Sequence, residues 1–224
     1  MRYEEKISYM KCLTFDQASK KAIVVFNQYG DRLGRLVPVG KWILSDVDLI
    51  EAIRSWRQKT KRMFLTQMES TFERTYGYLN NLSINQNGRL FFMLYDNSDR
   101  LIGHMGISGV DGEIGELDNL MRGVEGGDPR LIYFSEIALL KWCFKSLEIT
   151  ESFVRVLSYN WLVLALHEEV GFLFVDNKPL RKYEKDGFIH HDEVDHSKSN
   201  VNYNCTKLLL TRSNFFKRNL WLLQ

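Results

Sequence analysis

The 224-residue sequence predicts an α/β fold, and three patterns support this prediction. Short apolar runs are separated by turn sequences such as Asp186-Gly187, which is typical of antiparallel strands. Two longer segments, within residues 45–60 and 131–147, repeat apolar residues at helical spacing. Between them, a strand pattern passes through a glycine-rich turn directly into a helix.

The composition is that of an ordinary globular domain, with 45% apolar and 26% charged residues. The net charge is +2 and basic residues are scattered, which argues against a nucleic-acid-binding surface. The three cysteines, Cys12, Cys143 and Cys205, are few and odd in number, so we expect reduced thiols in a cytoplasmic protein. No apolar run has the roughly 20 residues needed to span a bilayer.

Residues 1–44 predict a β-rich N-terminal element. Three apolar runs, Ile7–Leu13, Ala22–Phe26 and Leu33–Val39, are separated by turn signals and predict strands that precede or extend the main sheet. They contain no catalytic constellation, so we expect an accessory or dimerisation role.

Two helices should follow this element. Ser45–Asp48 has the composition of a helix N-terminus, and apolar residues from Leu49 to Trp56 recur at helical spacing. Thr66 and Glu69 match a capping box and predict a second helix that starts there.

The centre of the sheet is predicted as a hairpin, Arg89–Tyr95 and Leu101–Ile107, followed by a strand over Glu113–Met121. Regular alternation along that strand divides its side chains between the two faces. One face would carry Glu116, Asp118, Leu120 and Arg122, and the other Leu117, Asn119 and Met121.

The glycine-rich turn after this strand is a candidate anion site. Gly123, Gly126 and Gly127 allow backbone amides to crowd together, and Asp128 and Pro129 suit the N-cap and first position of a helix. Free N–H groups at a helix N-terminus attract phosphate. An ordinary loop that joins a strand to a helix has the same composition, so both interpretations stay open.

The next helix, strand and helix carry a family resemblance. After the buried helix over Leu131–Leu147 and the strand Phe153–Leu157, residues 160–172 place Asn160, His167, Gly171 and Phe172 at the spacing of a known motif. This segment resembles the N-x-x-A-x-x-x-Y-x-x-x-G-F pattern of the GCN5-related N-acetyltransferases. Val163 takes the alanine position and His167 takes the tyrosine position.

The resemblance covers about residues 45–211 and leaves residues 212–224 as a C-terminal extension. It implies a mixed, mostly antiparallel central sheet flanked by helices, to which residues 1–44 add a β element. It also implies acetyl-CoA as donor, a primary amine as acceptor and no metal. The apolar segment Phe215–Leu223 is expected to dock on the body or on a second subunit of a homodimer.

The resemblance also implies a cofactor site on the central strand and the turn. The backbone of Asn119, Leu120 and Met121 would bond the pantetheine arm, since the central strand splays from its neighbour in the family. The turn resembles the family's (Q/R)-x-x-G-x-(G/A) pyrophosphate loop with displaced glycines. It would contribute Arg122, Gly123, Gly126 and Gly127, and Asn160 would bond the cofactor or cap its helix.

Candidate catalytic residues are His167 and Glu116. A histidine can give a proton near pH 7, so His167 would protonate the departing thiolate in place of the family's tyrosine. Glu116 would accept a proton from the amine, directly or through water. The alternatives are a structural histidine in the core and a carboxylate held in a surface ion pair.

Candidate acceptor contacts are Trp56, Arg57 and His104. Arg57 would bind a phosphate or carboxylate of the acceptor. The alternatives are that Trp56 belongs to the core and that Arg57 is solvated. The neighbouring His190 and His191 are not expected to chelate a metal, because adjacent residues of a strand point to opposite faces.

The favoured acceptor is a nucleotide-linked amino sugar of bacterial surface-glycan (O-antigen or lipopolysaccharide) biosynthesis. This preference comes from the region around Trp56 and Arg57 and from the hairpin near Asp186, which resemble sugar-acetylating members of the family. A protein N-terminus or lysine and a small free amine such as a polyamine are alternative acceptors. A non-catalytic acyl-CoA-binding module is the alternative from a different class.

Overall fold

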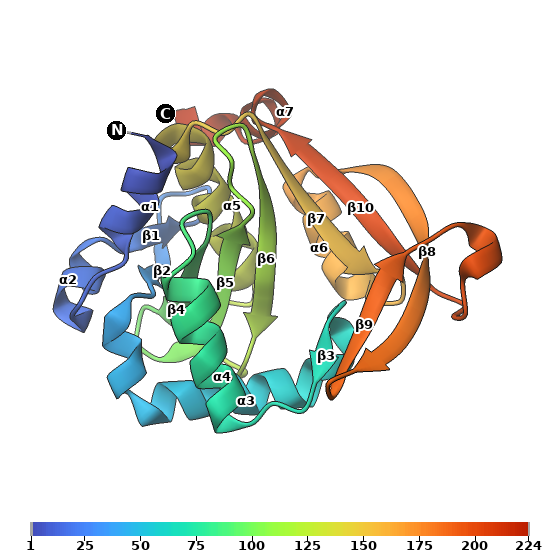
Figure 1. Cartoon of the computed structure of the whole chain (residues 1–224). Helices are drawn as coiled ribbons and strands as arrows, with labels where there is room; N and C mark the ends of the chain where they lie inside the picture. Colours follow the sequence, from blue (N-terminus) through green and yellow to red (C-terminus); the bar gives the residue numbers. More distant parts are fainter. Residues whose placement is uncertain (1, 224) are drawn as a thin grey trace.

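One mixed sheet of 10 strands runs through the molecule in the computed structural model, which describes residues 2–223 (Figure 1). Its spatial order is β1-β2-β4-β5-β6-β7-β10-β8-β9-β3, and β6–β7 is the parallel pair while the other neighbours are antiparallel. The strands are β1 (Ile23–Phe26), β2 (Arg32–Pro38), β3 (Gln67–Met68), β4 (Leu90–Asp96), β5 (Leu101–Ser108), β6 (Ile114–Arg122), β7 (Glu151–Leu157), β8 (Leu173–Lys185), β9 (Phe188–Glu193) and β10 (Asn204–Thr211).

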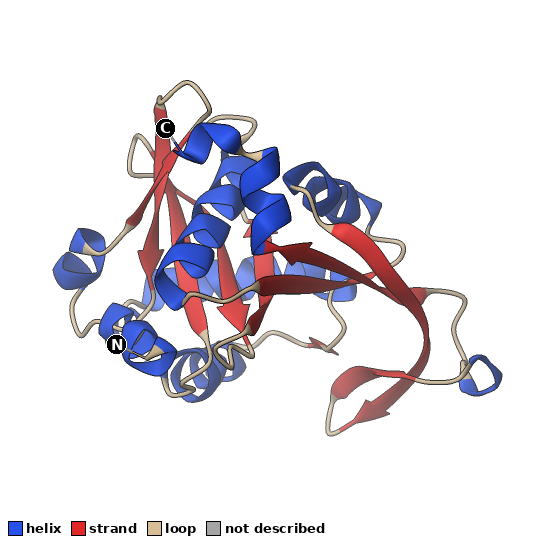
Figure 2. Ribbon diagram, turned by 90° about the horizontal axis from the view of Figure 1, so that it is seen from above, coloured by secondary structure: helices blue, strands red, loops and turns tan. Residues whose placement is uncertain are grey.

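Helices pack on both faces of the sheet, and the β8–β9 hairpin extends away from the body (Figure 2). The α-helices are α1 (Tyr3–Met10), α2 (Phe15–Lys20), α3 (Val47–Thr60), α4 (Phe72–Gly77), α5 (Leu131–Trp142), α6 (Trp161–Val170) and α7 (Arg212–Arg218). Short 3₁₀ segments are η1 (Lys41–Ser45), η2 (Lys61–Met63), η5 (His196–Lys198) and η6 (Leu220–Leu223), and wider π-helical turns are η3 (Tyr78–Ile84) and η4 (Cys143–Leu147).

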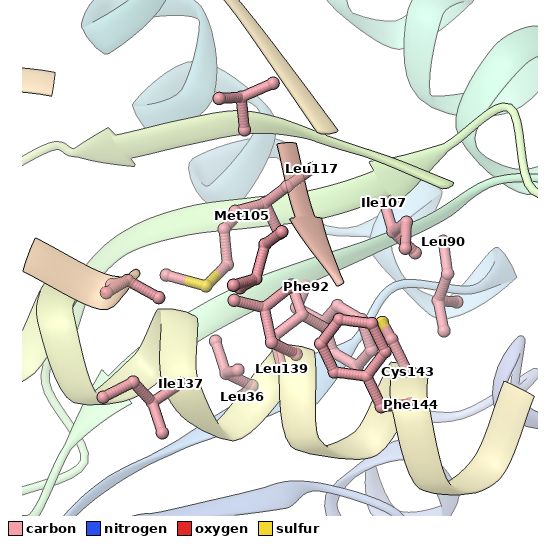
Figure 3. Close-up of a cluster of buried hydrophobic side chains, with 14 of the residues drawn as sticks. Leu36, Leu90, Phe92, Met105, Ile107, Leu117, Ile137, Leu139, Cys143 and Phe144 are labelled. Atoms are coloured by element: carbon pink, nitrogen blue, oxygen red, sulfur yellow. The ribbon is translucent and has the colours of Figure 1, made fainter. Parts of the chain in front are cut away.

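Each face of the sheet has its own apolar core, because β4 alternates between two buried sides. Leu90, Phe92 and Leu94 join the core under α5, whereas Phe91 and Met93 join the core under α3. Figure 3 shows Leu90 and Phe92 in the α5 core. The mixed, mostly antiparallel sheet flanked by helices is therefore as predicted.

The N-terminal element differs in part from the prediction. β1 and β2 form as expected and extend the main sheet through β2–β4 pairing. The predicted strand Ile7–Leu13 is wrong, because residues 3–10 form α1. Ile7 and Met10 lie three residues apart and are both buried, which is helical rather than strand spacing.

The second predicted helix starts later than the sequence suggested. α3 begins as expected, with the Asp46 carboxylate accepting from Leu49 N–H (3.0 Å). The capping box at Thr66 is wrong, since α4 is capped by Thr71. Glu69 binds Lys61 and Gln58 instead of reaching back to Thr66, and the intervening residues pair with β9 as β3.

The C-terminal segment docks on the body of the same chain. Phe215 of α7 is fully buried, and its ring centre lies 5.2 Å from that of Phe144. The hairpin signal at Asp186 and Gly187 is confirmed, because both residues have positive φ and join β8 to β9.

Replacing Phe144 by alanine should lower the free energy of unfolding by about 3–5 kcal/mol, because it opens a cavity in the α5 core. Phe174→Ala is the matched control, since Phe174 is 63% exposed and should change stability by only about 0.5 kcal/mol. Urea unfolding of both variants checks this. Equal losses of unfolding free energy in the two variants would contradict the assignment of Phe144 to the core and Phe174 to the surface.

Candidate functional site

The ladder between β6 and β7 ends early. The two strands pair at three positions only, and the last pair is Glu116–Phe153. β6 continues to Arg122 and β7 to Leu157, so their facing edges carry backbone groups that this ladder does not use. An extended ligand can bond to such groups like an added strand. The splaying expected of the central strand is confirmed.

β6 also contains a β-bulge just beyond this point. Asn119 and Leu120 together lie opposite one residue of β5, Met105. Asn119 has φ of 53°, a left-handed conformation that asparagine adopts more readily than most residues. The bulge rotates the backbone where β6 has lost its β7 partner.

The bulge makes the predicted alternation of β6 wrong beyond Asp118. Leu120 packs with Leu117 against the α5 core, whereas Met121 packs in the α3 core with Trp56. One inserted residue moves every following side chain to the opposite face.

A polar cluster lies on the α3 side of the bulge. The Asn119 carboxamide accepts a hydrogen bond from Arg57 (3.3 Å) and donates one to the Tyr78 hydroxyl (2.9 Å). Arg89 donates to the same hydroxyl (3.1 Å) and lies 3.6 Å from the Asp118 carboxylate. Burial raises the pKa of Asp118, and raises the pKa of Tyr78 to about 12. Two guanidinium groups and one carboxylate leave a partly buried positive charge here.

Arg57 carries that charge without a carboxylate partner among residues 2–223. Besides Asn119, it contacts the Thr66 carbonyl (3.4 Å) and lies over the Phe64 ring, 3.5 Å from its centre. Its side chain is half-buried, and burial lowers the pKa of the guanidinium. A partly dehydrated guanidinium with no ion pair is suited to bind a ligand anion.

Trp56 is a core residue, 6% exposed, which agrees with the core interpretation of this side chain. Its indole packs directly on Gly123, where an added Cβ would lie 2.1 Å from the ring. Gly123 is thus required by close packing, and its N–H donates to the Ile102 carbonyl of β5 (2.8 Å).

His104 is buried beside the bulge, 2% exposed, and lies between the rings of Trp56 and Phe91. Its Nδ1 lies 2.7 Å from the Asn119 carbonyl oxygen, which can only accept, so Nδ1 carries the proton. Burial lowers the pKa of His104 to about 4. Nε2 is buried without a hydrogen-bond partner in the described chain.

The glycine-rich turn leaves β6 between two arginines. Gly126 and Gly127 have φ of 115° and 67° and turn the chain toward α5. Arg122 donates to the Gly126 carbonyl, and the Arg100 guanidinium lies against the α-carbon side of Gly126. Asp96 neutralises Arg100 in an ion pair (3.1 Å), and Glu125 and Asp128 lie in the turn itself. Arg122, which forms no ion pair among residues 2–223, is therefore the cation available to an anion at this turn.

The helix after the turn begins at Leu131 as predicted, but its N-cap residue is Arg130 rather than Asp128. Asp128 is still engaged at this helix start, because its carboxylate accepts from the Arg130 N–H (2.7 Å). This hydrogen bond holds an Asp128 oxygen toward the helix start.

Glu116 is held in an ion pair. Its two oxygens each lie 2.9 Å from the Arg155 guanidinium, which reaches across from β7. The pair crosses between the strands just beyond their last ladder position. Glu116 thus forms an ion pair, as in the alternative interpretation of this residue. Its role as base stays a prediction.

His167 is buried between α6 and α5, with 3% of its surface exposed. Its Nδ1 lies 2.7 Å from Oε1 of Glu136, which is fully buried. Nε2 is then the ring nitrogen left to serve a ligand, and the role of His167 as acid stays a prediction.

Asn160 precedes α6 but makes no side-chain cap hydrogen bond, so its half-buried carboxamide is available to a ligand. Because β6 and β7 are parallel, the turn after β6 and Asn160 after β7 lie at the same end of the sheet (Figure 1). The bulge, the glycine turn and Asn160 therefore border one divergence between strands.

A cavity of about 550 Å³ lies between η2, β3, the turn before α6 and the β8–β9 hairpin. Its charged lining residues are Lys61, Arg62, Lys182, Glu69 and Glu184. Cations thus exceed carboxylates by one, since three basic and two acidic groups line it.

Two tyrosines form an aromatic wall of this cavity, Tyr159 and Tyr203, with ring centres 4.9 Å apart. His191 fixes this wall, because it donates from Nδ1 to the Leu65 carbonyl (2.7 Å) and accepts from the Tyr203 hydroxyl at Nε2 (2.8 Å). His191 is thereby occupied by hydrogen bonds. Among residues 2–223, no cluster of His, Cys, Asp and Glu is placed to hold a metal.

Sequence reasoning missed three members of the polar cluster: Asp118, Tyr78 and Arg89. The alternation of β6 gave a signal for Asp118, because it places this residue on the face of Glu116. No local pattern pointed to Tyr78 or Arg89, which η3 and the start of β4 bring to the bulge.

Comparison with solved structures identifies the fold of this chain. No family model matches the sequence, and no curated protein matches it. Solved structures do match: a GCN5-related N-acetyltransferase from Brucella melitensis has a TM-score of 0.65 at 14% identity, covering 90% of this chain and 85% of that one. A nucleotide-linked sugar GNAT, FdhC, has a TM-score of 0.60 at 13% identity, covering 90% and 94%.

The spermidine N-acetyltransferase of Vibrio cholerae, solved with CoA and spermine, has a TM-score of 0.59 at 14% identity. It matches over 75% of this chain and 93% of its own. The chain therefore has the fold of the GCN5-related N-acetyltransferases. No helix within residues 2–223 is long and apolar enough to cross a membrane.

The buried His104 should make the protein sensitive to mild acid. Its folded pKa of about 4 lies below the usual 6.5, so the unfolded chain binds more protons between these values. Stability should fall as pH drops through this window, by about 2 kcal/mol between pH 7 and pH 5. Urea unfolding at both pH values checks this against His104→Asn, in which this contribution should vanish. An unchanged pH dependence in the variant would contradict the assignment.

Proposed function

We propose that this protein is an acetyl-CoA-dependent N-acetyltransferase that acts on a primary amine. The observation that carries this proposal is the divergence of β6 and β7 at the bulge of Asn119, bordered by a glycine turn beside Arg122. A pantetheine arm is extended and rich in amides, so it can bond to the unpaired strand edge. The Gly126 and Gly127 N–H groups, which donate to no other described residue, and the Arg122 guanidinium would bind the pyrophosphate at the turn after β6.

The reaction transfers the acetyl group from the CoA sulfur to the amine nitrogen. The amine attacks the thioester carbon, the C–S bond breaks, the nitrogen loses a proton and the thiolate gains one. Glu116 is the proposed base, and Asp118 is a second candidate because burial raises its pKa and it adjoins the bulge. His167 is the proposed acid, acting through Nε2 while Glu136 holds Nδ1. The Leu120 or Met121 N–H would stabilise the oxyanion.

We propose an anionic acceptor, most simply a nucleotide-linked amino sugar. The unpaired Arg57 lies at the bulge, and its contact with the Thr66 carbonyl brings it next to the cavity wall at Gln67. The cavity has one excess cation and an aromatic wall, which suits a phosphate-bearing ligand with a flat ring. The similarity to FdhC points the same way.

A polyamine is the second candidate acceptor. Glu69 and Glu184 line the cavity, and the Vibrio cholerae enzyme of the same fold was solved with spermine. Lys61 neutralises Glu69 by an ion pair, which reduces the attraction for a polycation. A peptide or protein amine remains a third class for the assay below.

Calorimetric titration with acetyl-CoA, CoA and desulfo-CoA tests the donor site. All three should bind with micromolar affinity, and thiol release should then follow with a nucleotide-linked amino sugar but be weaker with spermidine or an N-terminal peptide. Failure of acetyl-CoA, CoA and desulfo-CoA to bind would overturn the proposal. Binding without thiol release from any acceptor class would favour a non-catalytic acyl-CoA-binding module.

Replacing Arg57 by glutamine should raise the acceptor KM about tenfold or more, because a charge-assisted hydrogen bond to the acceptor is lost. The KM for acetyl-CoA should stay within about twofold. Arg57→Lys should be intermediate, since lysine keeps the charge but not the planar fork. Lys20→Gln, a change on the exposed side of α2, is the control. An unchanged acceptor KM would exclude an anion contact at Arg57.

His167→Ala and Glu116→Ala should each lower kcat about a hundredfold while the affinity for acetyl-CoA changes little, because proton transfer contributes to the chemical step alone. The kcat of Asp118→Asn, measured in the same assay, identifies the base. If Asp118→Asn alone reduces kcat, the base is Asp118. Full activity of His167→Ala would remove the histidine from the mechanism.

A further inference from the structure

A buried imidazole controls the direction of the bulge backbone. His104 donates its Nδ1–H to the Asn119 carbonyl oxygen at 2.7 Å, and this carbonyl belongs to the one residue of β6 with positive φ. In a regular ladder, that carbonyl would bond to a backbone N–H of β5 or β7. At the bulge a side chain of β5 takes the place of the ladder.

The bond also sets the direction of the next amide. The C=O and N–H of a trans peptide point in opposite directions, so a carbonyl held toward His104 directs the Leu120 N–H away from it. The Leu120 N–H is one of the two donors proposed above for the thioester oxygen. A rotation of the Asn119–Leu120 peptide would turn this donor away.

The surroundings of His104 favour this role over ordinary packing. The centre of the His104 ring lies 6.0 Å from that of Trp56 and 4.8 Å from that of Phe91. Leucine or phenylalanine would fill this site without burying a polar atom. Nε2 is buried without a partner, which is unfavourable for stability. Buried polar atoms normally have hydrogen-bond partners. Exceptions are expected at functional sites, and His104 lies beside the backbone that we propose to bind the ligand.

We infer that His104 is a positioning residue, a neutral imidazole that clamps the Asn119 carbonyl and so aims the Leu120 N–H at the oxygen of the acetyl group. It does not touch the acceptor amine in this role, unlike the acceptor contact predicted from the sequence. The inference rests on the proposed function for the identity of the ligand. The clamp itself rests on the hydrogen bond and can be tested without turnover.

Two substitutions separate the clamp from packing. The carboxamide nitrogen of asparagine occupies nearly the position of Nδ1 in histidine, so His104→Asn keeps a donor to the Asn119 carbonyl. His104→Leu fills the site but has no donor. Phe144→Leu serves as a control for lost stability, since Phe144 lies in the α5 core and its ring packs on Phe215 and Phe216 rather than on His104.

Amide hydrogen exchange of the peptide that covers β6 gives the first readout. His104→Leu should speed exchange around residues 118–122 at least tenfold, while His104→Asn and Phe144→Leu should leave it near the wild-type rate. Equal exchange in His104→Leu and wild type would overturn the clamp.

Steady-state kinetics gives the second readout. His104→Leu should lower kcat about tenfold to a hundredfold with the acetyl-CoA KM within about twofold, and His104→Asn should recover most of the loss. Phe144→Leu should keep wild-type kcat. Equal kcat values in His104→Asn and His104→Leu would overturn the positioning role. If wild-type protein does not bind acetyl-CoA, the proposed function fails, and the exchange experiment still decides the clamp.

Discussion

The early end of the β6–β7 ladder is the constraint on which the rest of the structure depends. Past Glu116 and Phe153 the two strands leave backbone donors and acceptors that need partners. The apolar cores fix the strands on both sides of the divergence, because β4, β5 and β6 contribute to both cores and β7 and β10 contribute buried residues to the α5 core. The divergence is therefore built into the packing, and a bound extended ligand can complete the hydrogen bonding.

The bulge includes two buried polar atoms without hydrogen-bond partners in the described chain. They are His104 Nε2 and Arg89 Nε, whose side chains also bond to the Asn119 carbonyl and to Tyr78. Natural cores contain few such atoms, since each one reduces stability. At the bulge, this cost accompanies a defined arrangement of donors and charges around Asn119. The bulge, with Asn119 in a left-handed conformation, is part of the same arrangement.

Local signals predicted the parts of the fold that local chemistry decides. The turn at Asp186-Gly187, the apolar strand β4 and the helix after Asn160 were found because turn residues, apolar runs and helical spacing are local features of the sequence. α1 was missed because a short apolar run does not distinguish a strand from a helix. The bulge left no signal beyond an asparagine, and the cluster of Tyr78, Arg89 and Arg57 could not be predicted since three separate elements bring it together.

The central claim is that the gap between β6 and β7 holds acetyl-CoA. Hydrogen exchange of the wild-type protein, measured by mass spectrometry with and without acetyl-CoA, tests it most directly. Slower exchange in residues 117–130 and around Asn160 is the predicted result, because the ligand would cover the strand edge, the glycine turn and the start of α6. Unchanged exchange in these segments at saturating acetyl-CoA, or protection confined to the β8–β9 hairpin, would contradict it.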